Sequence, residues 1–144
     1  MVLSIDPGGS GAAVLRSETG GITTVIDYEG TASIARALDY HPITQAVIER
    51  VWASPVMSVS AAFAFGENYG AWCTAIALKG IPLEEVLPQA WQRNVCPHVR
   101  GTGTERKRAL KLEAQRRFPD LRVTLRNCDA LLISEYAHKH RQCA

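Results

Sequence analysis

The sequence predicts an α/β fold in which helices cover both faces of a mixed β-sheet. Three short apolar runs near the N-terminus are separated by short turns, a pattern typical of an antiparallel meander. Further along the chain, segments with helical periodicity alternate with short apolar runs, which favours strands joined through helices. With 144 residues, of which 47% are hydrophobic and 21% charged, the chain fits a single domain, residues 1–144, with a sizeable core.

The first half of the chain contains the predicted meander and one further buried strand. The meander strands are expected at Val2–Asp6, Ala12–Leu15 and Ile22–Ile26, and Gly8-Gly9-Ser10-Gly11 forms the first turn. A short helix is expected from Thr31 or Ser33 to about Tyr40, where His41-Pro42 stops it. Gln45–Val51 is then expected to form a buried strand with one carboxylate at its end.

The second half begins with a long helix, expected from Ser58 to Lys79 and closed by Gly80. Gly66 and Gly70 lie one turn apart on it and permit close approach of another backbone. Packing on the sheet explains these glycines as well as dimerisation does. The remaining elements are a strand at Glu85–Leu87, a loop at Val95–Thr104, a basic helix at Glu105–Phe118, a short extended stretch at Leu121–Leu125 and a last helix at Cys128–His140.

The net charge of +2 conceals a division along the chain. Residues 1–91 carry four basic and nine acidic groups, a balance of −5, whereas residues 92–126 carry ten basic and three acidic groups, a balance of +7. An acidic half that binds cations and a basic segment that binds phosphates are what a nuclease needs. A solvated basic helix without a partner explains the charge alone equally well.

Neither the N-terminus nor the cysteines indicate an extracellular protein. No apolar run approaches the roughly 20 residues that span a bilayer, and the N-terminus lacks the basic region of a signal peptide. We therefore expect a cytoplasmic protein with reduced thiols at Cys73, Cys96, Cys128 and Cys143. A zinc site using Cys96 and His98 is disfavoured because the spacing lacks the usual ligand pairs.

Three carboxylates occupy positions where a buried charge needs an explanation. Asp6 ends the first apolar strand, Glu49 follows Ala46-Val47-Ile48, and Asp129 lies near the start of an apolar helix. Taken singly, Asp6 can stabilise its glycine turn, Glu49 can pair with Arg50 or Arg36, and Asp129 can interact with the helix dipole. If the first and fourth strands are neighbours, however, Asp6 and Glu49 converge, and a helix crossing the sheet edge can bring Asp129 to them.

Phosphodiester cleavage gives a chemical reason to gather carboxylates. The reaction needs an activated water and a stabilised leaving oxygen, and two Mg²⁺ ions about 3.5–4 Å apart meet both needs. Mg²⁺ prefers hard oxygen ligands, and carboxylates that repel one another become tolerable when cations are present. On this hypothesis Asp6 bridges both ions, while Glu49 and Asp129 each bind one.

Three motifs, in order along the chain, resemble those of the RuvC family of Holliday-junction resolvases, particularly its short phage-type members. They are Ile5-Asp6-Pro7-Gly8-Gly9-Ser10-Gly11, Ala46-Val47-Ile48-Glu49-Arg50-Val51-Trp52 and Cys128-Asp129-Ala130-Leu131-Leu132-Ile133. Phe65-Gly66 through Gly70 and Pro88-Gln89-Ala90-Trp91-Gln92 are also similar to phage-type members. The matches extend from residue 2 to about residue 137.

The resemblance implies a ribonuclease H-like fold with a five-stranded mixed sheet, and a homodimer that makes paired, symmetric nicks in four-way junctions. It implies dependence on Mg²⁺, for which Mn²⁺ is expected to substitute, and a bacterial or phage-infected cell as the location. Asp6, Glu49 and Asp129 match the metal-binding carboxylates, and Lys107 matches a catalytic lysine near the scissile phosphate. Trp52 matches an aromatic residue that stacks at the junction centre, where base stacking contributes about 1–3 kcal/mol; otherwise it is a core tryptophan.

Contact with DNA is then expected from the basic segment. On the helix, Lys107 and Lys111 share a face that Arg108 borders. Phosphate contacts position a substrate without reading its bases, so a preference for junctions has to come from dimer geometry and from Trp52. The DNA-binding candidates are Trp52, Arg93, Arg100, Arg106, Lys107, Arg108 and Lys111.

Two positions depart from the family pattern. Arg126 stands where the family often has another acid, and neighbouring Asn127 is a weaker metal ligand, so the second ion is expected to be loosely bound. Gln92 stands where phage-type members tend to have lysine, although Arg93 follows it. The alternatives are a nuclease of the same fold that cuts flaps, forks or other branched DNA, and a non-catalytic junction-binding module.

Overall fold

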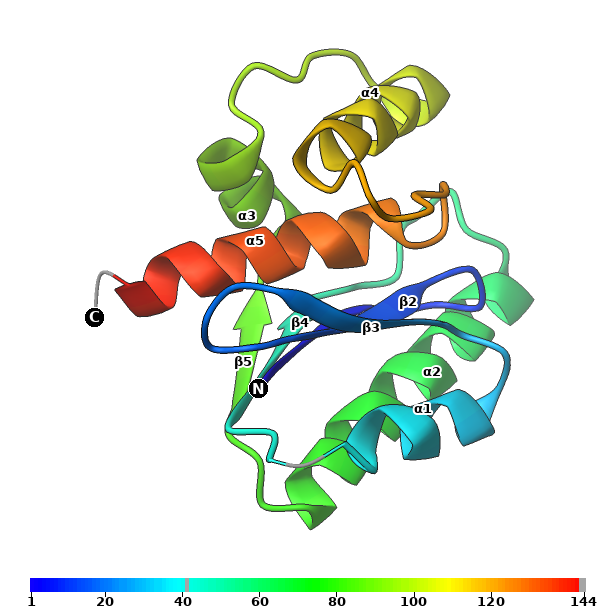
Figure 1. Cartoon of the computed structure of the whole chain (residues 1–144). Helices are drawn as coiled ribbons and strands as arrows, with labels where there is room; N and C mark the ends of the chain where they lie inside the picture. The colour runs from blue at the N-terminus through cyan, green and yellow to red at the C-terminus, as the bar shows by residue number, and fades with distance from the viewer. Residues whose placement is uncertain (41, 143–144) are drawn as a thin grey trace.

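The computed structural model describes residues 1–40 and 42–142 and contains a five-stranded mixed β-sheet with helices on both faces (Figure 1). The strands are β1 (Val2–Asp6), β2 (Ala12–Arg16), β3 (Ile22–Asp27), β4 (Gln45–Glu49) and β5 (Leu83–Val86). The helices are α1 (Thr31–Leu38), α2 (Val59–Leu78), α3 (Pro88–Val95), α4 (Gly103–Arg117) and α5 (Cys128–Gln142). His41 and Cys143, named in the sequence analysis, lie outside the described residues.

The strand pairing confirms the predicted meander and joins it to a parallel half. β1 pairs antiparallel with β2, and β2 antiparallel with β3. After α1 the chain returns in β4, which lies parallel to β1 on its other side, and β5 then pairs parallel with β4. In the order β3-β2-β1-β4-β5, the first and fourth strands are therefore neighbours, and their carboxyl ends lie at the same edge of the sheet.

Each central strand contributes to two cores because successive side chains point to opposite faces. Leu3 and Ile5 of β1 pack with α1 and α2, whereas Val2 of β1 and Val47 of β4 pack with α3, α4 and α5. Helix α5 lies between the sheet and the other two helices of its layer (Figure 1). Its segment 130–133 is completely buried, which explains why those four successive residues are apolar. Burial of each large aliphatic side chain contributes about 1.5–3 kcal/mol.

Several predicted elements need correction. Residues 88–95, for which no helix was predicted, form α3. This helix begins with Pro88, and in the first turn of a helix the missing N–H of proline costs no hydrogen bond. The last strand lies at Leu83–Val86 rather than Glu85–Leu87, and β4 ends at Glu49 rather than Val51. Residues 121–125 form no strand; they lead into a turn that precedes α5.

The long helix α2 confirms the predicted helix and its closure by Gly80, but it rules out one explanation of its two internal glycines. The Ser58 hydroxyl accepts the N–H of Ala61, and Gly80 adopts a left-handed φ of 65° after the last turn. A Cβ added at Gly66 or Gly70 would have no neighbour within 4 Å, so close packing on the sheet does not explain these two glycines. The buried stripe of α2 instead runs through other positions, including Trp72 and Ile76.

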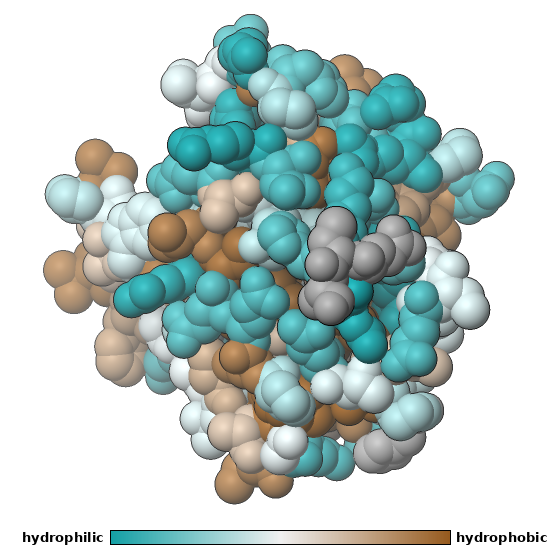
Figure 2. All heavy atoms as spheres, turned by 90° about the vertical axis from the view of Figure 1, so that its left-hand side faces the viewer, coloured by the Kyte–Doolittle hydropathy of each residue, from teal (hydrophilic) through white to brown (hydrophobic). Residues whose placement is uncertain are grey.

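The molecular surface is mainly polar on the side that lies to the left in Figure 1. Hydrophilic side chains dominate that view, and hydrophobic ones form scattered patches between them (Figure 2). Among the described residues, no helix has both the length and the apolar character needed to cross a membrane.

Candidate active site

Asp6 and Glu49 are brought together by the two central parallel strands. Ile5 of β1 is in register with Ile48 of β4, so the residues that follow them lie side by side, at a strand separation of about 4.8 Å. Both isoleucines face α1 and α2. Because side chains alternate, Asp6 and Glu49 face the opposite layer, formed by α3, α4 and α5.

Two helices of that layer complete the cluster. Asp129 lies in the first turn of α5, where the helix dipole favours a carboxylate. The Nζ atom of Lys107, on α4, lies 2.5 Å from Asp129 Oδ2 and 3.9 Å from Asp6 Oδ2. Four separate elements thus gather the three carboxylates and the lysine selected from the sequence.

Trp91 of α3 is a residue of this site that the sequence analysis did not assign a role. Its indole Nε1 donates a hydrogen bond of 2.6 Å to Glu49 Oε2, and its side chain is completely buried. The alternative partners predicted for Glu49 were wrong, because Arg50 pairs with Glu85 and Arg36 with Glu29. The tryptophan in the Pro88–Gln92 motif was the available signal, but its contact depends on the unpredicted helix α3.

Burial and, to a smaller extent, neighbouring charges raise the pKa values of Asp6 and Glu49. Burial, followed by the charge of Asp129, raises the pKa of Asp6 well above its ordinary value, although Lys107 opposes the shift. Burial raises the pKa of Glu49 to about 7, against the lowering effect of the hydrogen bond from Trp91. The pKa of Lys107 is also raised, because the carboxylates outweigh its burial. The site therefore favours additional positive charge.

The chemical type of these side chains suits a hard divalent cation, whereas their present spacing does not. Carboxylate oxygens in a crowded, partly buried cluster are the ligands that Mg²⁺ prefers. Within residues 1–40 and 42–142, however, no group of three or more acidic, histidine or cysteine side chains is arranged to hold one ion. The Lys107 ammonium supplies the positive charge between Asp6 and Asp129 in this arrangement.

The glycine turn after β1 is held by Asn68 of α2, not by Asp6 as the simpler interpretation had it. Asn68 Oδ1 accepts the N–H of Gly8 at 2.7 Å, and the N–H of Gly11 donates to the Gly8 carbonyl at 3.0 Å. A Cβ at Gly11 would lie 2.0 Å from the backbone oxygen of Asp6. The sequence analysis did not identify Asn68 as a site residue. The available signal was that Asn68 lies one turn before Trp72, which places a polar side chain on the buried side of α2.

A groove of about 880 Å³ lies directly beside Asp6 and Lys107. The glycine turn and the N-terminal half of α2 form its walls, and Arg126 also lines it. The Arg126 Nη2 atom donates to the carbonyl oxygens of Tyr28 at 2.5 Å and Gly9 at 3.4 Å. Asn127, considered as a metal ligand, instead accepts the N–H of Thr124 within the turn that precedes α5.

The predicted DNA-binding residues differ in the exposure and the hydrogen bonding of their side chains. The side chains of Arg93, Arg100 and Arg108 are exposed, and Lys111 is half-buried. Arg106 is half-buried, and Gln92 Oε1 accepts two of its N–H groups at 3.0 and 2.7 Å. Gln92 therefore positions an arginine. Trp52 is 54% exposed in the loop after β4, which excludes the core interpretation of this side chain.

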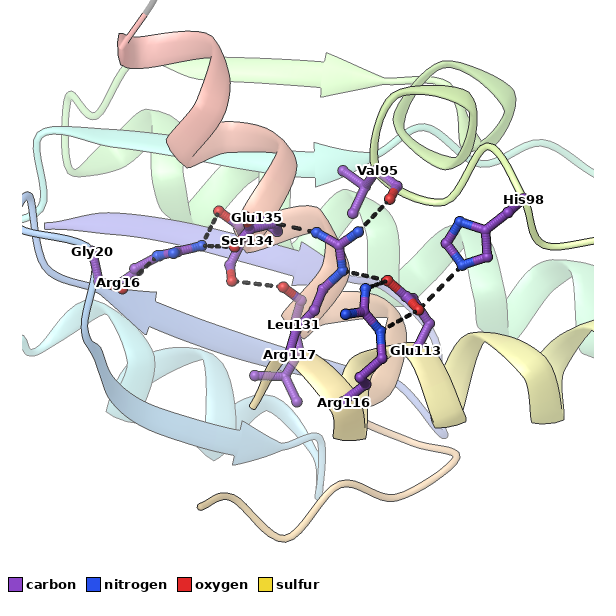
Figure 3. Close-up of polar contacts among 10 residues, drawn as sticks. All are labelled: Arg16, Gly20, Val95, His98, Glu113, Arg116, Arg117, Leu131, Ser134 and Glu135. Atoms are coloured by element: carbon purple, nitrogen blue, oxygen red, sulfur yellow. Dashed lines mark hydrogen bonds and ion pairs between the residues drawn. The ribbon is translucent and has the colours of Figure 1, made fainter. Parts of the chain in front are cut away.

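A charged network fixes α4, and therefore Lys107, against its neighbours (Figure 3). Glu135 of α5 accepts from Arg16 of β2 at 2.8 Å and lies 3.8 Å from Arg117. Glu113 of α4 is bound by Arg117 at 2.7 Å and lies 3.2 Å from the His98 ring. The network, which connects β2, α4, α5 and the α3–α4 loop, consists of Arg16, His98, Glu113, Arg116, Arg117 and Glu135.

The sheet order and the two helix layers are those of a ribonuclease H-like α/β fold. No family model and no curated protein matches the sequence. Among solved structures, the chain is similar to RuvC of T. thermophilus in complex with a Holliday junction substrate, with a TM-score of 0.69 and 16% identity over 98% of this chain and 94% of that one. A second Thermus thermophilus RuvC structure gives a TM-score of 0.64 and 17% identity over 99% and 96%. The expected resemblance to RuvC is thus confirmed at the level of the fold.

Proposed function

We propose that this protein is a Mg²⁺-dependent endonuclease that resolves four-way DNA junctions by paired nicks. The observation that carries the proposal is the convergence of Asp6, Glu49 and Asp129 at the carboxyl ends of β1 and β4. This site lies on a fold shared with a RuvC protein in complex with a Holliday junction substrate. A structural role alone leaves unexplained why three carboxylates crowd into a site that raises the pKa of two of them.

The three carboxylates would hold the divalent ions, and Mn²⁺ is expected to replace Mg²⁺. The ions would stabilise the charge on the attacking and leaving oxygens of the phosphodiester. Trp91 keeps Glu49 oriented toward the cluster through its indole N–H. Lys107 neutralises Asp6 and Asp129 in the absence of a cation, and its ammonium would lie beside the phosphate in the complex.

DNA would lie across the exposed basic side chains of the α3–α4 layer. Each arginine or lysine that neutralises a phosphate adds affinity without reading sequence. Trp52, exposed three residues after Glu49 in the chain, would offer an aromatic face to an unstacked base. The contributing basic residues would be Arg93, Arg100, Lys107, Arg108 and Lys111, together with the half-buried Arg106 that Gln92 holds.

A homodimer would supply the second active site that paired nicks require. The outer side of α2 exposes Val59 by 88% and Phe63 by 67%. Gly66 and Gly70 continue this side, with open space where a Cβ would lie. Apolar residues and glycines at helical spacing suit a second copy of the same helix, because the glycines let two backbones approach closely.

The test compares cleavage of a four-way junction, a fork, a flap and linear duplex, with and without Mg²⁺. We expect Mg²⁺-dependent cutting of the junction in preference to the other substrates. Asp6→Asn should abolish cutting while junction binding persists, and Asp39→Asn, an exposed aspartate after α1, is the matched control. Equal cutting of linear duplex would contradict junction specificity, and unchanged cutting by Asp6→Asn would remove the assigned site.

The same assay separates the remaining alternatives. A nuclease for other branched DNA would prefer the fork or the flap. A non-catalytic junction-binding module would bind the junction without cutting it at any Mg²⁺ concentration. The ion pair between Lys107 and Asp129 is the feature that favours this second alternative, because a lysine then neutralises the acids permanently.

A further inference from the structure

The groove beside Asp6 and Lys107 is walled mainly by apolar side chains that a ligand can reach. It lies at the end of the sheet where the glycine turn after β1, the start of α2 and the turn before α5 come together (Figure 1). Phe65 and Met57 are half-buried and Leu125 is 47% exposed, so these lining residues keep part of their surface accessible. The groove therefore suits an occupant with a large apolar surface.

The charged side chains that line the groove cancel one another. Asp6 and Glu67 carry negative charge, whereas Lys107 and Arg126 carry positive charge, so the lining has no net formal charge. The Arg126 guanidinium is already bound to the Tyr28 carbonyl. Because an unpaired charge is costly to transfer into apolar surroundings, a lining of this kind favours a neutral occupant over a phosphate or another anion.

The position of the groove relates its occupant to the strand that is cut. Asp6 and Lys107 belong both to the carboxylate cluster and to the lining of the groove. A strand with one phosphate at the cluster therefore places a neighbouring nucleotide at the groove. A cavity of about 880 Å³ holds one drug-sized molecule, which a single nucleotide matches and the stacked base pairs of a duplex exceed.

The ring of Phe65 is fixed against the glycine turn. A Cβ added at Gly8 would lie 3.0 Å from Phe65 Cε2, and Gly8 adopts a φ of 124°, which favours glycine. Asn68, three residues after Phe65 on α2, accepts the Gly8 N–H and so holds the turn and the helix together. An aromatic ring that is held in place loses little conformational freedom when a ligand stacks on it.

We propose that this groove holds one unpaired nucleobase, next to the phosphate that is cut, with Phe65 as its stacking platform. The inference rests on the proposed function, since it requires a DNA strand at Asp6. Phe65 is separate from Trp52, which lies in the loop after β4. Removal of a base from a duplex costs free energy, and the cost is least where the base is already unpaired. The groove thus gives a physical reason for a preference for branch points over linear duplex.

The test measures binding of the whole chain to four-way junctions in EDTA. One junction is intact, and each of the others lacks a single base at one position around the branch point. For the wild type, loss of the base that enters the groove should weaken binding about fivefold or more, the effect of stacking one base. Phe65→Ala should bind the intact junction more weakly by a similar factor and should not respond to loss of that base, because ring and base act as one pair. Tyr40→Ala, which removes an exposed aromatic ring beyond the end of α1, should behave like the wild type.

A second variant separates stacking from folding. Phe65→Leu keeps an apolar side chain beside Gly8 without the ring, so thermal melting should show a folded protein that has lost the response as Phe65→Ala has. The slope of log K against log salt should stay that of the wild type in both variants, because no phosphate contact is lost; a smaller slope overturns the base subsite.

The outcomes for the subsite and for the nuclease proposal can be told apart. If both Phe65 variants respond to every missing base as the wild type does, the subsite is overturned, whatever the wild type cuts. A wild type that shows the response but does not cut in Mg²⁺ refutes the nuclease proposal and not the subsite. A wild type that binds no branched DNA refutes both.

Discussion

At the scale of single residues, Gly11 determines whether the end of β1 can hold Asp6 in place. A Cβ at this position would lie 2.0 Å from the Asp6 backbone oxygen, so either the turn or the strand must move. We expect Gly11→Ala to destabilise the protein by about 2–4 kcal/mol, in the range of severe backbone and packing defects, and to abolish cleavage. Gly9→Ala is the matched control, because a Cβ there meets nothing within 4 Å. Chemical denaturation and junction cleavage measure both effects, and equal behaviour of the two variants would contradict the argument.

The hydrogen bond from Trp91 to Glu49 leads to a second prediction at this scale. This bond lowers a pKa that burial raises to about 7, so Trp91→Phe should raise the pKa of Glu49 further. A carboxylate must lose its proton to bind a cation. At pH 7 we therefore expect roughly tenfold weaker Mg²⁺ binding by calorimetry, from the loss of one hydrogen bond to a charged group. The defect should shrink at pH 8.5, whereas Trp72→Phe, in the other core, should show no such pH dependence.

Sequence reasoning found the carboxylates but not the residues that hold them. Asp6 and Glu49 were detectable because each is a charge that ends an apolar strand, and strand pairing alone makes them neighbours. Trp91 and Asn68 act through contacts made 42 and 60 residues away along the chain, between elements whose packing no local pattern specifies. Gln92 could be noted as an unusual residue, but its role in holding Arg106 required the relative position of α3 and α4.

At the scale of elements, the stability of α4 depends on Glu113 being ionised. Its side chain is 6% exposed, and hydrogen bonds from Arg116 and Arg117 lower its pKa to about 2. A carboxyl group with a lowered pKa contributes stability that is complete above its unfolded value of about 4.5 and is lost as pH falls toward 2. Glu113→Gln should therefore cost roughly 2–3 kcal/mol at pH 7.

The pH dependence provides the check on this prediction. Urea denaturation at pH 7 and at pH 3 should show that the difference between wild type and Glu113→Gln narrows in acid. Glu105→Gln, a change of the same charge in the exposed first turn of α4, should show a much smaller difference. A constant difference across this pH range would mean that Glu113 stabilises α4 through packing rather than charge.

The helices and strands also show where local sequence patterns were enough to predict their positions. β1, β2 and β3 are short apolar runs between turn residues, and α2 is a long segment between Ser58 and Gly80, so the positions of these elements were predicted closely. Helix α3 was missed because it is only eight residues long and its first turn has no side-chain cap. The stretch 121–125 was considered extended because it is apolar, but Val123 packs into the core beside α5 without strand pairing.

At the scale of the whole molecule, paired nicking requires two active sites in one particle, and the exposed side of α2 is where the second copy would bind. Phe63→Glu places a charge at the centre of that side, so we expect a monomer by light scattering and a junction nicked on one strand at a time. Leu112→Glu, which changes another exposed hydrophobic residue on α4, should leave the mass of the dimer unchanged. Because Phe63 is 67% exposed in the single chain, its replacement should hardly alter the monomer's own stability. A dimer that survives Phe63→Glu would place the interface elsewhere, and a wild-type protein that is strictly monomeric at assay concentrations would rule out coordinated paired nicks.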